Sequence, residues 1–152
     1  MILRRSLLVA APLFGQSIPA NKVVDKGPPI EAPIVKEFVG AAHGNLARTK
    51  EMLAERPGLI NAAWDWGGGD FETALGGASH MGAKEIAVYL LDQGARMDIF
   101  AAAMLGKLEI VRAMCQGMPG IHKVLGPHKI PLIAHARRGG SNAVVQFLES
   151  QE

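Results

Sequence analysis

The residues best suited to chemistry lie between Trp64 and His80. This segment holds three carboxylates and one imidazole, contributed by Asp65, Asp70, Glu72 and His80. Such groups can ligate a metal ion or act as an acid–base pair. Their spacing matches no known ligand motif such as His-Glu-x-x-His, so we assign no metal ligand, no catalytic residue and no cofactor. A small-molecule or metal-binding site here, with hydrolysis as its possible reaction, is kept as the alternative function.

The same segment is rich in aromatic residues. Trp64 and Trp66 are the only tryptophans of the chain, and Phe71 follows a run of three glycines. Aromatic side chains on a loop are favoured recognition anchors, and acidic neighbours favour a cationic partner. The other interpretation is that the tryptophans fold back to cover the stack. The candidate partner-binding residues are Trp64, Asp65, Trp66, Asp70, Phe71, Glu72 and His80.

The triple glycine does not indicate a nucleotide site. Gly67, Gly68 and Gly69 lack a preceding strand with a following helix, and no lysine comes after them. Both are needed in a phosphate-binding loop. The remaining histidines are also interpreted as structural. His122 and His128 flank one connection and could bind a transition metal, but no further ligands lie nearby in sequence, so we favour a structural role.

The other three histidines lie near glycines that end predicted helices, at positions 44, 82 and 139. His43, His80 and His135 lie at different offsets from those glycines, so we do not expect them to form one ladder. Cys115 is the only cysteine and stands at an inward-facing position of a helix. A buried free cysteine acts as a small apolar residue, and a single cysteine excludes an intramolecular disulfide.

A helix-pair pattern that recurs around Gly44, Gly82, Gly106 and Gly139 must position these residues. Such a segment cannot bury its own apolar face and must stack on copies of itself. Small alanines mark the first helix of each pair, and larger apolar residues mark the second. The predicted helices span about 38–43 and 46–56, 75–81 and 84–93, 99–105 and 108–116, and 131–138 and 142–150.

These residues carry a family resemblance. Thr73, Leu75, Gly94-Ala95, Ala102-Ala103, Ile110-Val111, Pro131-Leu132 and Phe147-Leu148 match ankyrin-repeat positions. The chain therefore resembles the ankyrin-repeat family over about residues 36–150, and more closely a group of small exported bacterial ankyrin-repeat proteins. The resemblance implies an all-α, ankyrin-like solenoid of about four helix-pair repeats with a long glycine-rich finger loop. It implies a binding role on the concave face and finger loop, and no reaction.

The chain is predicted to be organised in three parts. Residues 1–20 have a basic start and a short apolar run, typical of a signal peptide of the Sec or twin-arginine type. Residues 21–35 form an extended proline-rich linker, and residues 36–152 form the ankyrin-repeat domain. We therefore expect an exported protein, periplasmic or secreted, without stable membrane insertion after signal removal.

Charge and surface composition indicate which classes of partner molecule the protein can bind. Without residues 1–20 the basic and acidic residues are equal in number, which argues against nucleic-acid binding. A protein or peptide partner is expected. Val144, Val145 and Phe147 could leave apolar surface at the C-terminal end, so a monomer or weak homodimer is predicted.

Overall fold

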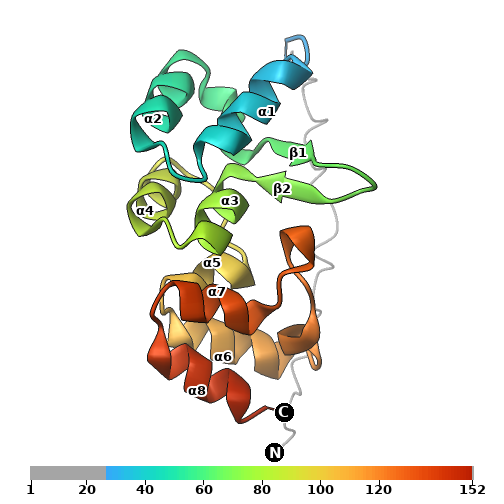
Figure 1. The fold of residues 1–152 in the computed structure, drawn as a ribbon, viewed down its shortest axis with the longest axis vertical. Coiled ribbons are helices and arrows are strands. Elements are labelled where there is room, and N and C mark those ends of the chain that lie inside the picture. The colour runs from blue at the N-terminus through green and yellow to red at the C-terminus, as the bar shows by residue number, and fades with distance from the viewer. Residues whose placement is uncertain (1–26, 152) are drawn as a thin grey trace, which may run out of the picture.

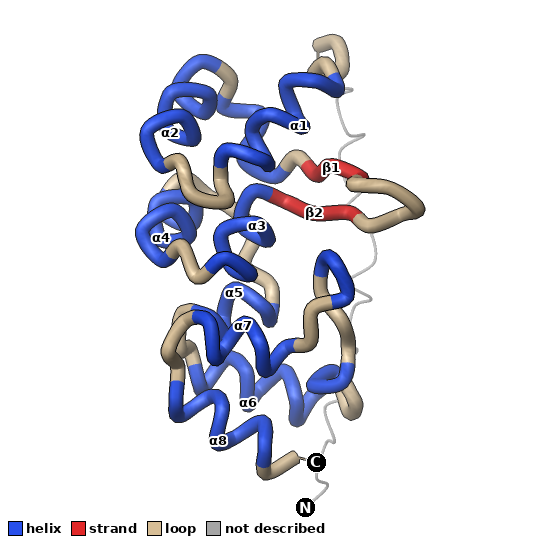
Figure 2. Tube along the Cα trace, viewed as in Figure 1, coloured by secondary structure: helices blue, strands red, loops and turns tan. Residues whose placement is uncertain are grey.

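The computed structural model describes residues 27–151. The predicted signal peptide, residues 1–20, and the first part of the predicted linker lie outside the described residues. Within residues 27–151 the protein is mostly helical, with one small two-stranded sheet (Figures 1 and 2). None of the helices in this part of the chain has the length and apolar character needed to cross a membrane.

The predicted helix pairs are present with boundaries close to those expected. The α-helices are α1 (Ala32–Ala41), α2 (Leu46–Glu55), α3 (Ala74–Met81), α4 (Lys84–Asp92), α5 (Ile99–Met104), α6 (Leu108–Gly117), α7 (Leu132–Arg138) and α8 (Asn142–Glu149). Three short 3₁₀ helices are η1 (Pro57–Asn61), η2 (Ile121–Lys123) and η3 (Pro127–Lys129).

Helix α1 begins earlier than predicted. The linker was expected to run to residue 35, but the helix starts at Ala32 and carries Pro33 in its first turn. A proline is tolerated there because the first helical N–H groups have no partner within the helix. The extended linker is therefore limited, in the described part of the chain, to residues 27–31.

The helix pairs stack in two rows. Helices α1, α3, α5 and α7 contact one another in that order, while α2 contacts α4 and α6 contacts α8 (Figure 1). Fully buried alanines let the helices of the first row approach closely, among them Ala42, Ala78, Ala102 and Ala136. Gly139 shows how close this contact is, since a Cβ atom there would fall on the carbonyl of Met104.

A β-hairpin leaves the stack between the first two helix pairs. Strand β1 (Ala63–Asp65) pairs antiparallel with β2 (Phe71–Thr73), and Trp64 lies opposite Glu72. The hairpin projects from the side opposite α2 and α4, and the 121–131 connection lies on that same side (Figure 1). Thr73 ends β2 and caps α3 by accepting a hydrogen bond from the backbone N–H of Gly76. This cap fixes how the hairpin enters the stack.

The C-terminal pair is better covered than predicted. Val144 is fully buried, Val145 and Phe147 are partly buried, and the guanidinium of Arg112 lies 5.1 Å from the centre of the Phe147 ring. Cys115 is partly buried against the same apolar cluster, and burial raises the pKa of its thiol. Both observations fit packing roles in the second half of the stack.

Candidate metal centre

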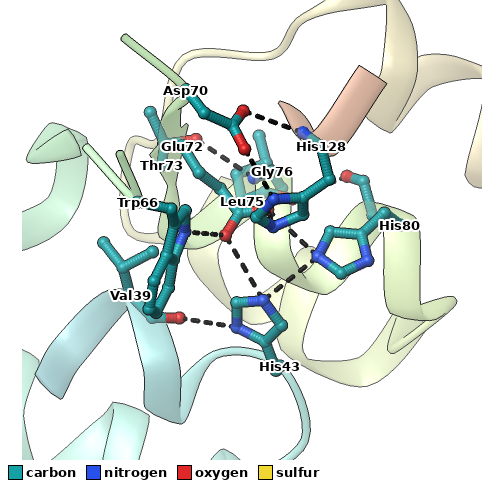
Figure 3. Close-up of polar contacts among 11 residues, drawn as sticks. Val39, His43, Trp66, Asp70, Glu72, Thr73, Leu75, Gly76, His80 and His128 are labelled. Atoms are coloured by element: carbon teal, nitrogen blue, oxygen red, sulfur yellow. Dashed lines mark hydrogen bonds and ion pairs between the residues drawn. The ribbon is translucent and has the colours of Figure 1, made fainter. Parts of the chain in front are cut away.

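Four side chains from separate elements converge beside the hairpin. They are His43, Glu72, His80 and His128, and one donor atom from each lies within 4.8 Å of all the others. His43 lies in the turn after α1, Glu72 on β2, His80 in the last turn of α3, and His128 in η3. Figure 3 shows the three imidazoles directed at the Glu72 carboxylate. We call these four residues the His₃Glu cluster.

The spacing of the donor atoms suits one metal ion. Glu72 Oε1 lies 3.0 Å from His80 Nε2 and 3.5 Å from His128 Nε2, and Glu72 Oε2 lies 3.3 Å from His43 Nε2. The Nε2 atoms of His43 and His80 are 3.1 Å apart. Zn²⁺ bonds of about 2.0–2.1 Å place tetrahedral ligand atoms roughly 3.3–3.4 Å apart. These four distances thus lie close to the tetrahedral value, while other donor separations in the cluster extend up to 4.8 Å.

The outer ring nitrogens fix the orientation of two imidazoles. His43 Nδ1 lies 3.0 Å from the backbone carbonyl oxygen of Val39, and His128 Nδ1 lies 2.8 Å from Asp70 Oδ2. Both oxygens only accept, so each Nδ1 must donate a proton. In the neutral ring the Nε2 lone pair then faces the Glu72 carboxylate. Lone pairs facing a carboxylate repel it unless a proton or a metal cation lies between them, and such outer hydrogen bonds are typical of metal-bound histidine.

Glu72 is the buried centre of the cluster. Its side chain is fully buried, and Trp66 donates its indole N–H to Oε2 at 2.8 Å. Burial acts to raise the pKa of Glu72, but the adjacent imidazoles of His43 and His80 and the hydrogen bond from Trp66 outweigh it and lower that pKa to about 2. Oε1 accepts no well-formed hydrogen bond within the described chain, although two imidazoles surround it. A buried anion with an unsatisfied oxygen is well suited to a cation.

Two glycines in α3 make room for the cluster. A Cβ atom on Gly77 would lie 2.8 Å from His43 Cε1, and one on Gly76 would lie 3.2 Å from Glu72 Cγ. Glycine inside a helix costs about 1 kcal/mol relative to alanine. The pair is therefore explained by the space that His43 and Glu72 need, and not by helix formation.

The segment that carries His128 has an unusual backbone. His128 and the following Lys129 both have φ of +57°, although neither is glycine. Asp70 holds His128 there, because its Oδ1 accepts the backbone N–H and its Oδ2 accepts Nδ1–H, each at 2.8 Å. These bonds, first the backbone one, lower the pKa of Asp70. Left-handed backbone at non-glycine positions persists where the surroundings enforce it, often at functional sites.

The sequence candidates separate into three groups in space. Glu72 and His80 belong to the cluster, while Asp70 and Trp66 contact it from outside. Asp65 turns away and accepts the backbone N–H groups of Gly67 and Gly69. These three groups do not form the single acidic site that the sequence suggested.

The aromatic candidates are neither fully buried nor fully free. Trp64 is partly buried, with the ammonium of Lys36 5.7 Å from its ring centre. Trp66 is 38% exposed, and its ring lies edge-on to His43. Phe71 is 64% exposed. Trp66 thus packs against one side of the cluster, whereas Phe71 exposes an apolar surface to solvent.

Sequence reasoning missed two members of the cluster. His43, His80 and His135 were expected not to form one ladder, but the stacking of α1 on α3 brings the rings of His43 and His80 together, a contact that this expectation did not foresee. His128 was grouped with His122 as structural, but only His128 reaches Glu72. The signal in the sequence was the Gly76-Gly77 pair, because two adjacent glycines are unfavourable within a helix and indicate that other side chains pack closely there. His135, by contrast, packs on Phe100 outside the cluster.

An open pocket adjoins the cluster. It has a volume of about 610 Å³ and is lined by Gly67, Gly68, Gly69, Asp70, Leu125, Gly126, His128 and Lys129. Asp70 and His128 belong both to this pocket and to the surroundings of the candidate metal position. The pocket therefore adjoins the cluster at its most exposed member, His128.

Comparison with known proteins adds no family assignment. No model of a known protein family matches the chain, and no curated protein matches it either.

Proposed function

We propose that the protein binds a divalent first-row transition metal ion, with His43, His80 and His128 as nitrogen ligands and Glu72 as the oxygen ligand. The observation that carries the proposal is the convergence of three Nε2 atoms on one buried carboxylate, two of them held in that orientation by outer hydrogen bonds. Imidazole-rich sites with one carboxylate suit Zn²⁺, Fe²⁺, Co²⁺ and Ni²⁺.

The position of the cluster favours an accessible metal over a closed structural one. Side-chain exposure rises from none at Glu72 to 33% at His128. Structural Zn²⁺ sites close four tetrahedral positions inside the protein, whereas functional sites keep one side open to water or a ligand. The open side here is the pocket beside His128. The proposal assigns metal binding and no reaction.

We also propose that the fold is an ankyrin-type solenoid, as the resemblance in sequence implies. Stacked helix pairs with a hairpin between the first two support an ankyrin-type solenoid with a long finger, because each pair covers the apolar face of the next. The finger then places Glu72 against α1 and α3. Export of the mature chain remains part of this proposal, on the basic and apolar pattern of residues 1–20.

Equilibrium dialysis against Zn²⁺ and Co²⁺ tests the metal proposal. The wild-type protein should bind one ion, and Co²⁺ should give the visible absorption of a nitrogen-rich, low-coordinate site. His80→Ala should weaken binding by about 100-fold or more, because a ligand is lost. His122→Ala is the matched control, since that histidine lies outside the cluster, and it should bind like wild type. Equal binding by both variants would refute the proposal.

Partner binding through the finger is a second candidate function. The exposure of Phe71 at the hairpin supports it, because exposed aromatic side chains are frequent anchors in interfaces. A protein or peptide partner should be retained by wild type and lost on Phe71→Ser. Val88→Ser is the control, since Val88 is 47% exposed on α4, away from the hairpin. Equal loss on both variants, or retention on both, would contradict this candidate.

A further inference from the structure

We propose that the pocket beside the His₃Glu cluster binds a small oxyanion, a carboxylate or a phosphate, which coordinates the metal and pairs with Lys129. This inference rests on the proposed metal site and names the class of ligand that completes it. The pocket volume, about 610 Å³, lies in the range of roughly 300–1,000 Å³ that is usual for small-molecule sites.

Location is the first argument. The pocket lies between the hairpin loop and η3, and it meets the cluster at His128. His128 is also the most exposed of the four proposed ligands. A free coordination position would therefore open into this pocket. A small anion bound there can reach the metal without displacing a protein ligand.

Charge is the second argument. The pocket is lined by one carboxylate, Asp70, and both of its oxygens are occupied by His128. The nearby Asp65 carboxylate accepts the N–H groups of Gly67 and Gly69. Lys129 is the lysine that lines the pocket, and its ammonium group forms no ion pair with any described residue. A cationic group beside a cationic metal favours an anionic ligand.

The loop wall supplies the third argument. Cβ atoms built on Gly67, Gly68 or Gly69 would meet nothing within 4 Å, so packing does not require glycine at these positions. Their positive φ angles, +135°, +65° and +87°, do favour glycine. The result is a pocket wall without side chains, in which the N–H groups of Gly67 and Gly69 are already bound by Asp65. Lys129 lines the same pocket from η3, and its backbone is left-handed like that of His128 before it. The glycine wall thus leaves open space for a ligand in the pocket that Lys129 also lines.

The test uses the full chain loaded with Co²⁺, whose visible spectrum reports a change of ligand. Phosphate and malonate are titrated separately, and malonamide serves as the neutral probe. One or both anions should change the spectrum saturably, and malonamide should not. Whichever anion binds identifies the phosphate or carboxylate class. Lys129→Met should weaken that anion by about tenfold, as expected for loss of one charge-assisted contact.

The control variant is Lys123→Met, because Lys123 is exposed on η2 and does not line the pocket. It should bind the anion like wild type, and both variants should bind Co²⁺ with unchanged affinity. Co²⁺ binding without any effect of either anion would overturn the anion inference alone. Equal anion binding by Lys129→Met would also overturn it. Failure of wild type to bind Co²⁺ would overturn the metal site and this inference together.

Discussion

Asp70 accepts two hydrogen bonds from His128, one from the backbone N–H and one from Nδ1–H, both at 2.8 Å. This contact joins the hairpin to η3 across 58 residues of sequence. It sets the direction of His128 Nε2 toward Glu72 and holds a backbone conformation that a non-glycine residue rarely adopts. The proposed metal centre therefore depends on a residue that does not itself belong to the cluster.

Asp70→Asn should weaken metal binding by about 10- to 100-fold, the usual effect of removing an outer partner of a ligating histidine. The amide keeps an acceptor for one bond but loses the charge that favours Nδ1–H donation. Isothermal titration with Zn²⁺ measures the change. Asp65→Asn is the control, since that carboxylate only orders the glycine loop. Equal affinity for wild type and Asp70→Asn would show that His128 needs no such support.

Gly77→Ala should separate helix stability from metal binding. A Cβ there would lie 2.8 Å from the His43 ring, so the imidazole must move. We expect at least a tenfold weaker affinity for Zn²⁺, although helix propensity alone favours alanine by about 1 kcal/mol. Gly40→Ala in α1 is the matched control, because its Cβ would meet nothing within 4 Å. Gly40→Ala should raise stability and leave Zn²⁺ affinity unchanged. A Gly77→Ala protein that binds Zn²⁺ normally would contradict the role given to this glycine.

The metal-free protein should show a stability optimum that depends on His43 and Glu72. The hydrogen bond with Glu72 raises the pKa of His43 despite its burial, so this contribution is complete below pH 6.5 and is lost as pH rises through the folded pKa. The pKa of Glu72 is lowered from 4.5 to about 2, so its contribution is present above pH 4.5 and is lost as pH falls toward 2.

These two shifts predict that the pair stabilises the metal-free protein most between about pH 4.5 and 6.5. Urea unfolding with EDTA, from pH 3 to pH 8, measures the free energy of unfolding. Glu72→Gln should remove both dependences and cost ~2 kcal/mol near pH 5.5, because it leaves the imidazoles without a buried anion. A variant with the same pH profile as wild type would refute the assignment.

His135 should act in the opposite direction. Its side chain is fully buried, Nδ1 donates to the Pro131 carbonyl oxygen, and Nε2 has no partner within the described residues. Burial lowers the pKa of His135. Stability from this neutral imidazole is present above pH 6.5 and is lost as pH falls toward the folded pKa.

His135→Leu should therefore reduce the loss of stability between pH 8 and pH 5, even if the lost hydrogen bond makes the variant less stable at pH 8. Urea unfolding at both pH values gives the comparison. An unchanged difference in His135→Leu would mean that His135 is not the titrating group.

Local sequence features determined the helices and their turns. Apolar spacing and the glycines at the helix ends placed seven of the predicted segments within a residue or two of the observed helices, because these signals act over a few neighbouring residues. The start of α1 was misplaced since Pro33 was taken as a helix breaker, whereas a proline in the first turn breaks no hydrogen bond.

Part of the site could also be found in the sequence. Glu72, His80 and Asp70 lie close together along the chain, and their chemistry marks the segment by itself. Trp66 stood out for its size, but its hydrogen bond to Glu72 was not foreseeable. Alternation along the hairpin decides that Glu72 faces inward and Phe71 outward, and that depends on the observed register.

Only the tertiary structure brought His43 and His128 to Glu72. His43 reaches Glu72 because α1 stacks on α3, and His128 reaches it because Asp70 binds the connection that carries it. No local pattern encodes such contacts, because a stacked array brings together side chains whose separation depends on the length of every intervening loop. The sequence by itself therefore determined the helices and half of the donor groups, while the packing of the array decided that they form one site.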